Sequence, residues 1–128
     1  MSKVADDLLY TREHMWVLVE DNIATVGLTD HAQFELGELT GIELPAVGAE
    51  VEQGGEAGAV ESVKTTAALS MPVSGKVLEV NEDLEDDPAP INEDPYVDGW
   101  ICKIALSDPE EVEVLLSAED YEDFLAEE

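Results

Sequence analysis

Lys64 is the residue whose type and position most clearly point to chemistry. It is one of five basic residues in a chain with 32 acidic ones, and it lies in the run Val-Glu-Ser-Val-Lys-Thr-Thr-Ala-Ala-Leu at positions 60–69. Glycines precede this run, and the turn Pro72-Val73-Ser74-Gly75 follows it. Because both flanks have the composition of strands, we expect Lys64 at or near the tip of a β-hairpin. An exposed amine on a rigid turn is a candidate for covalent modification, and the alternative is a solvated turn lysine without a special role.

The other residues that could do chemistry do not form a catalytic group. Cys102 is the only cysteine, which excludes an intramolecular disulfide, and its place in the apolar run 99–106 favours a buried thiol over a nucleophile. His14 and His31 have no histidine or cysteine neighbours at ligand spacing, so we expect no metal site. The chain has no glycine-rich phosphate loop and no Ser-His-Asp order. We therefore expect a protein that is not an enzyme.

The formal charge of −27 limits the classes of partner. Nucleic-acid binding needs clustered lysine and arginine, so we exclude nucleic acid as a partner. No run of about 18 apolar residues is present, so we expect no membrane span. Acids at Asp6 and Asp7 do not fit a signal peptide, which favours a cytoplasmic protein. The acidity suits docking to basic partner surfaces or a salt-rich cytosol, and both interpretations stay open.

Short strands are the elements that would position Lys64. The length of 128 residues and the hydrophobic fraction of 45% fit one domain, residues 1–128. Frequent turns and alternating apolar residues predict a compact β-sandwich or barrel of six to eight strands. The expected strands cover residues 15–19, 23–28, 39–44, 57–63, 67–71, 75–80 and 99–106.

Helices are expected in two places. A short internal helix would begin at Thr29 or Asp30 and end at Gly37, with His31, Phe34 and Leu36 as core or packing residues. Near the C-terminus, Ser107 and Glu110 have the spacing of a capping box, and residues 117–124 suggest a second helix. The segment 82–95, with seven acids and three prolines, is expected to be a solvated loop.

Motifs along almost the whole chain resemble one family. They include Tyr10-Thr11-Arg12-Glu13-His14 followed by Trp16, the segment 24–33 (ATVGLTDHAQ), residues 60–64 (VESVK), Pro72-Val73-Ser74-Gly75 and Asp98-Gly99-Trp100. In this order and spacing, from about Tyr10 to Leu125, the sequence resembles the glycine cleavage system H protein family, whose members are lipoyl carriers. The resemblance implies a mainly β, lipoyl-domain-like β-barrel-sandwich hybrid. It also implies a lipoyl hairpin at about 58–72 and an acidic helical C-terminus at about 107–126.

The resemblance further implies that Lys64 carries lipoic acid through an amide bond, with Glu61, Ser62 and Val63 as the lipoylation motif. A protein of this kind would catalyse nothing itself. It would carry an aminomethyl unit on a swinging arm from glycine decarboxylase to aminomethyltransferase and be reoxidised by dihydrolipoyl dehydrogenase. A lipoate ligase or lipoyl transferase would attach the arm.

Some positions depart from the family pattern, and they bear on the cargo. The family places the loaded arm in a cleft that would correspond here to Glu13, His14, Met15 and Ala68. Met15 and Ala68 stand where acids are expected, and a carboxylate would favour a cationic amine in such a cleft. The alternative is an H-like lipoate-binding protein that carries sulfur for a heterodisulfide-reductase-like complex in sulfur oxidation.

Overall fold

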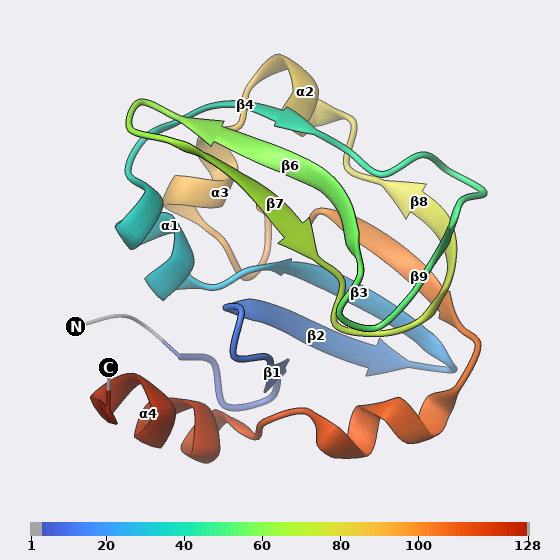
Figure 1. Cartoon of the computed structure of the whole chain (residues 1–128). Helices are drawn as coiled ribbons and strands as arrows, with labels where there is room; N and C mark the ends of the chain where they lie inside the picture. Colours follow the sequence, from blue (N-terminus) through green and yellow to red (C-terminus); the bar gives the residue numbers. More distant parts are fainter. Residues whose placement is uncertain (1–3, 128) are drawn as a thin grey trace.

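The computed structural model, which describes residues 4–127, contains nine strands in two antiparallel sheets (Figure 1). The ends of the expected domain 1–128 therefore lie outside the described residues. The larger sheet has six strands, in the order β1 (Leu9–Tyr10), β2 (Met15–Glu20), β3 (Ile23–Leu28), β9 (Cys102–Leu106), β8 (Gly75–Val80) and β5 (Glu50–Val51). The smaller sheet has the order β4 (Leu39–Glu43), β6 (Glu56–Ser62) and β7 (Thr66–Ser70).

This architecture confirms the mainly β prediction, with differences at short elements. The two-residue strands β1 and β5 are too short to show a periodic pattern, which explains why only six to eight strands were expected. β9 begins at Cys102 and not at Gly99. No helix in the described part of the chain is long and apolar enough to cross a membrane.

The main core lies between the two sheets. Inward-facing side chains of both sheets are almost fully buried, as for Val26, Val60 and Ile104. A second apolar cluster lies on the other face of β2, around Tyr10, Trp16 and Tyr121. Successive side chains of a strand point to opposite faces, so β2 serves both clusters at once. Gly27 opposes Trp16 in the β2–β3 ladder, and a Cβ there would lie only 2.6 Å from the indole nitrogen.

The internal helix α1 (Asp30–Leu36) forms as predicted. The Thr29 hydroxyl accepts a hydrogen bond from the Ala32 N–H at 3.2 Å. Gly37, at φ 82°, ends the helix and donates its N–H to the Gln33 carbonyl. The packing role of Leu36 is confirmed, because it packs against the main core. The expected packing role of Phe34 is wrong, since its side chain is 76% exposed.

The expected loop 82–95 is also corrected, because it contains two short helices, α2 (Asp83–Asp86) and α3 (Ala89–Glu93). Each is anchored by one fully buried residue, Leu84 or Ile91. The acids of this segment are mostly exposed around these anchors, and proline is tolerated in the first turn of α3. A single apolar anchor per helix is too weak a pattern to stand out in so acidic a segment.

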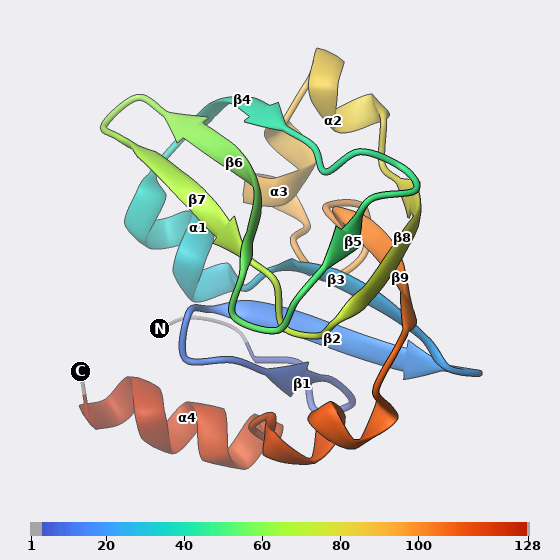
Figure 2. The same ribbon diagram turned by 45° about the vertical axis from the view of Figure 1, so that its right-hand side comes forward.

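The C-terminal region runs beneath β1 and β2 as a 3₁₀ helix, η1 (Pro109–Val114), followed by α4 (Ala118–Glu127) (Figure 2). The expected capping box is replaced by Asp108, whose carboxylate accepts from the Glu110 N–H at 3.1 Å. The expected start of the last helix at Ser117 is confirmed, because its hydroxyl accepts from the Asp120 N–H.

Candidate functional site

Lys64 lies in the turn between β6 and β7, at the tip of a hairpin, as the sequence predicts. The β6–β7 hairpin is at the upper left of Figure 1. The two strands pair as far as Glu61 and Thr66, and the Ser62 N–H then donates to the Thr65 carbonyl at 2.8 Å. Val63 and Lys64 are both exposed in the turn that results. The amine of Lys64 is therefore presented at the end of a hydrogen-bonded ribbon.

Ser62 makes this turn rigid. Its hydroxyl oxygen accepts hydrogen bonds from the N–H groups of Lys64, at 3.2 Å, and Thr65, at 3.1 Å. Ser62 itself is only 8% exposed. A buried side chain that satisfies two backbone donors fixes the conformation of the residues between them. Ser62, two residues before Lys64 in the motif, thus has a structural role that its contacts explain.

Val63 and Glu61 connect the tip to its neighbours. The Val63 N–H donates to the Glu38 carbonyl at 3.0 Å, which ties the hairpin to the segment after α1. The exposed Glu61 carboxylate lies 3.4 Å from the hydroxyl of Thr40 on β4. The tip is held from both sides and is not a free loop.

Gly37 makes room for the Lys64 side chain. A Cβ at this position would lie 3.1 Å from Lys64 Cε and 3.8 Å from Nζ. The lysine stem therefore runs along the glycine that ends α1. The same glycine serves as helix terminator and as a close-approach site, and its φ of 82° favours glycine over any other residue.

A pocket of about 850 Å³ opens beside Lys64, between α1 and α4. We call it the Lys64 pocket. Its walls combine apolar groups with four carboxylate side chains, so it suits a ligand that has an apolar stem and a cationic end. The lining residues are Val4, Asp30, His31, Phe34, Glu35, Lys64, Glu122, Asp123, Leu125 and Ala126.

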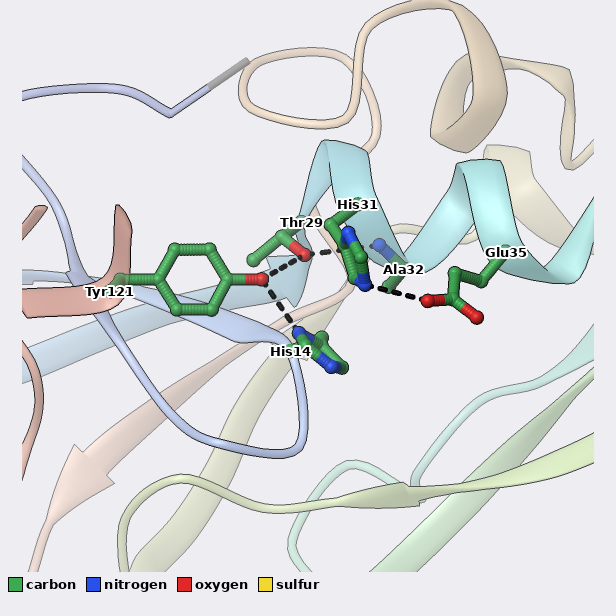
Figure 3. Close-up of polar contacts among 6 residues, drawn as sticks. All are labelled: His14, Thr29, His31, Ala32, Glu35 and Tyr121. Carbon is green, nitrogen blue, oxygen red and sulfur yellow. Dashed lines mark hydrogen bonds and ion pairs between the residues drawn. The ribbon is translucent and has the colours of Figure 1, made fainter. Parts of the chain in front are cut away.

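A polar network holds α4 against α1 (Figure 3), and two of its residues, His31 and Glu35, line the Lys64 pocket. The Tyr121 hydroxyl lies 2.7 Å from His14 Nδ1 and 2.9 Å from the Thr29 hydroxyl, which caps α1. The His14 and His31 rings lie 4.5 Å apart, and His31 Nε2 lies 2.7 Å from Glu35 Oε1. The buried ring of Tyr121 also stacks on Tyr10, with centroids 4.5 Å apart. This network fixes the position of the pocket wall that α4 provides.

Sequence reasoning missed Tyr121. The available signal was an aromatic residue with acidic neighbours on both sides, at the spacing of one turn from Ser117. Its partners His14 and Thr29 lie 107 and 92 residues away, so the sequence gives no direct indication of the contact.

The structure does not gather the four expected cleft residues around Lys64. Met15 is 1% exposed in the main core. Ala68 pairs with Ala59 on the outward face of the small sheet, since its neighbour Leu69 points into the core. Glu13 borders a different hollow, and only His14 approaches the Lys64 pocket, through its contacts with His31 and Tyr121.

Cys102 has the environment expected of a packing residue. It is fully buried in β9, and this burial raises the pKa of its thiol to about 12. At neutral pH the thiol is therefore protonated and out of reach of solutes. Burial also raises the pKa of the Tyr10 hydroxyl above its usual value, an effect reinforced by Tyr96.

Comparisons with known proteins agree with this geometry. Residues 8–128 match the family model described as glycine cleavage H-protein. The chain is 52% identical over 128 residues to the glycine cleavage system H protein of Carboxydothermus hydrogenoformans, covering 100% of this chain and 98% of the relative. It is 50% identical over 124 residues to that of Staphylococcus saprophyticus, covering 97% and 98%.

A solved structure extends the agreement to three dimensions. The crystal structure of a glycine cleavage system H protein from Mycobacterium marinum superimposes with a TM-score of 0.90 at 36% identity, covering 96% of this chain and 99% of that one. Members of this family carry a lipoyl group on a lysine. The chain belongs to the glycine cleavage H-protein family and is a lipoyl carrier protein.

Proposed function

We propose that Lys64 is the lysine that carries the lipoyl group. The supporting observation is its position at the exposed tip of a hairpin that Ser62 makes rigid. The other lysines of the described part lie within strands: Lys76 in β8, and Lys103 in β9 with its amine 5.5 Å from the centre of the Trp100 ring. A modifying enzyme reaches the end of a hairpin more easily than the middle of a sheet.

The surroundings of Lys64 fit the group it would carry. Gly37 leaves space along the stem, and the Lys64 pocket opens beside the amine. When attached, the dithiolane of the lipoyl group supplies the sulfur chemistry that accepts an aminomethyl unit and passes it on. The carboxylates of Asp30, Glu35 and Glu122 would favour the charged form of an amine placed in this pocket.

The protein itself acts as a carrier and not as an enzyme. The rigid tip presents the modified lysine to successive partners, and tethering raises the effective concentration of the reactant at each of them. The partners in this proposal are glycine decarboxylase, aminomethyltransferase and dihydrolipoyl dehydrogenase, together with the lipoate ligase or lipoyl transferase that attaches the group. A cytoplasmic location, expected from the sequence, stays a prediction.

The sulfur-carrier alternative loses its main support. It relied on the absence of acids at Met15 and Ala68, but neither residue lines the Lys64 pocket. The pocket has carboxylates from α1 and α4 instead. The relatives described above are glycine cleavage proteins, and no finding favours a sulfur cargo.

The attachment site is tested by mass spectrometry after expression in a host that makes lipoyl groups. We expect a mass increase of one lipoyl group in the wild type and in Lys76→Ala, and none in Lys64→Ala. Peptide mapping should place the modification on Lys64. A mass increase that survives Lys64→Ala would refute the assignment.

The carrier role is tested with purified partner enzymes. The lipoylated protein should support exchange between glycine and bicarbonate in the presence of glycine decarboxylase and should show no turnover alone. Modified protein that fails to support this exchange with any glycine decarboxylase would contradict the proposed cargo.

A further inference from the structure

Two exposed apolar side chains flank Lys64, and the carrier role alone does not account for them. Phe34 is 76% exposed and Val63 is 64% exposed. Phe34 lines the same pocket as Lys64, and Val63 Cγ2 lies 3.9 Å from the position of a Cβ on Gly37, which the Lys64 stem also approaches. Isolated exposed apolar residues are common, so the position of these two side chains beside Lys64 is informative and their exposure alone is not.

The surface around Phe34 and Val63 is acidic. Asp30 and Glu35 lie on α1, Glu122 and Asp123 on α4, and all four line the Lys64 pocket. Glu38, whose carbonyl binds the Val63 N–H, is exposed at the edge of the tip. The other lysine and arginine residues between positions 4 and 127 are Arg12, Lys76 and Lys103, and none of them lines this pocket. An apolar centre with an acidic rim matches a partner that has an apolar recess edged by lysine and arginine.

We propose that Phe34 and Val63, with the carboxylates around them, form the surface that the lipoyl-attaching enzyme recognises. This inference rests on the proposed role of Lys64. It adds a residue of α1, outside the hairpin motif, to the features that select this lysine for modification.

The short distance between the Lys64 amine and the backbone favours the lipoyl-attaching enzyme over the enzymes that use the finished arm. The amine to be acylated is one side chain away from the backbone, and its stem packs along Gly37. An enzyme that joins an acyl group to this amine must therefore touch the residues beside it, including Phe34 and Val63. Enzymes that use the finished arm meet its far end and have no need to contact α1. A second copy of the chain is a poor occupant, because two molecules of charge −27 repel each other.

The apolar contacts are tested by steady-state lipoylation of the unmodified protein by a purified lipoate–protein ligase with lipoate and ATP, followed by mass spectrometry. We expect Phe34→Ser to lower kcat/KM by about tenfold or more, mainly through KM, since truncating a central aromatic anchor removes much of an interface's affinity. Val63→Ser should have a smaller effect, and Phe34→Leu should retain most of the activity. Val114→Ser is the matched control, because Val114 is 70% exposed on η1, and it should behave as wild type.

The acidic rim is tested by two charge reversals of equal size. We expect Glu38→Lys, beside the tip, to raise KM several-fold, while Glu85→Lys, on α2, leaves it unchanged. Equal effects of the two variants would show that only net charge matters and would overturn the proposed surface. Unchanged melting temperatures would confirm that all variants are folded.

Three further outcomes would refute the proposal. The first is wild-type lipoylation kinetics in Phe34→Ser. The second is a dimer of the wild type that Phe34→Ser abolishes in sedimentation, because the surface would then belong to a second copy. The third is normal lipoylation of Phe34→Ser with impaired glycine–bicarbonate exchange, which would assign the surface to glycine decarboxylase. Failure of the proposed attachment site is distinguished from all three, because it appears in the peptide map of the wild type.

Discussion

The hairpin tip and the pocket wall beside it are built from contacts of opposite range. At the tip, Ser62 bonds to backbone groups two and three residues away. In the wall, Tyr121 bonds to residues 107 and 92 positions away and so fixes α4 against the cap of α1. The Ser62 turn can form as soon as the hairpin forms, whereas the wall requires the whole chain to be folded. We therefore expect the two regions to respond separately to substitution.

Tyr121→Ala should separate the behaviour of the pocket wall from that of the hairpin tip most strongly. This change removes a fully buried ring that stacks on Tyr10, together with the hydrogen bonds to His14 and Thr29. We expect a loss of about 3–5 kcal/mol in the free energy of unfolding, as for other large-to-small core changes. Urea unfolding gives this value, and lipoylation of the still-folded fraction at Lys64 should persist. Lipoylation that disappears while the protein remains folded would show that the tip depends on the wall.

Met15→Glu is the next largest change, and it tests whether position 15 belongs to the core or to a cleft. Met15 is 1% exposed among apolar residues. A carboxyl group there would have a pKa above the unfolded value of about 4.3, because burial disfavours the charged form. The folded state would bind the proton more tightly than the unfolded state, so the destabilisation is smallest below about pH 4 and grows as the pH rises.

At pH 7 we expect Met15→Glu to cost about 3 kcal/mol, measured by urea unfolding from pH 4 to 8. Ala68→Asp is the control, since Ala68 lies on the outward face of β7 and should tolerate the charge. If Met15→Glu is as stable as wild type at pH 7, position 15 faces water, and the prediction that it lies in the cleft for the loaded arm is supported.

Positions 15 and 68 also show the limit of what the sequence could predict. The strands β3 and β8, the cap and end of α1 and the exposed position of Lys64 follow from local rules of periodicity, capping and turns, and they were predicted correctly. The pocket was not, because its walls come from α1 and α4, which meet only through contacts such as Thr29 with Tyr121. The exposure of Phe34 was missed for the same reason: an aromatic residue in a short helix is buried or exposed according to which element covers it.

Gly37→Ala should have a moderate effect that links the two regions. The residue has φ 82°, and its added Cβ would lie 3.1 Å from Lys64 Cε. We expect a cost of about 1–2 kcal/mol from the left-handed conformation. We also expect slower lipoylation, because the Lys64 stem must move away. Gly48→Ala is the control, since Gly48 has φ 91° with no neighbouring atom within 4 Å. If both variants lose the same stability but only Gly37→Ala is lipoylated more slowly, the slower reaction is due to the steric contact with Lys64 and not to backbone strain.

The smallest change in stability is expected from Ser62→Ala, which tests how much rigidity the tip needs. The variant removes the acceptor for the N–H groups of Lys64 and Thr65, but these groups can turn to water because both residues are exposed. We therefore expect only about 1 kcal/mol in the free energy of unfolding. Hydrogen exchange of the same two amides should quicken, while exchange in β2 and β9 stays unchanged.

Lipoylation of Ser62→Ala should slow, since the amine is no longer held in one place. Thr65→Ala removes a hydroxyl that makes no bond to the Lys64 amide, and this control should keep the wild-type rate. If Ser62→Ala is modified as fast as wild type, the enzyme recognises the surface around Lys64 and not the turn itself, which would leave Phe34 and Val63 as the main determinants of recognition.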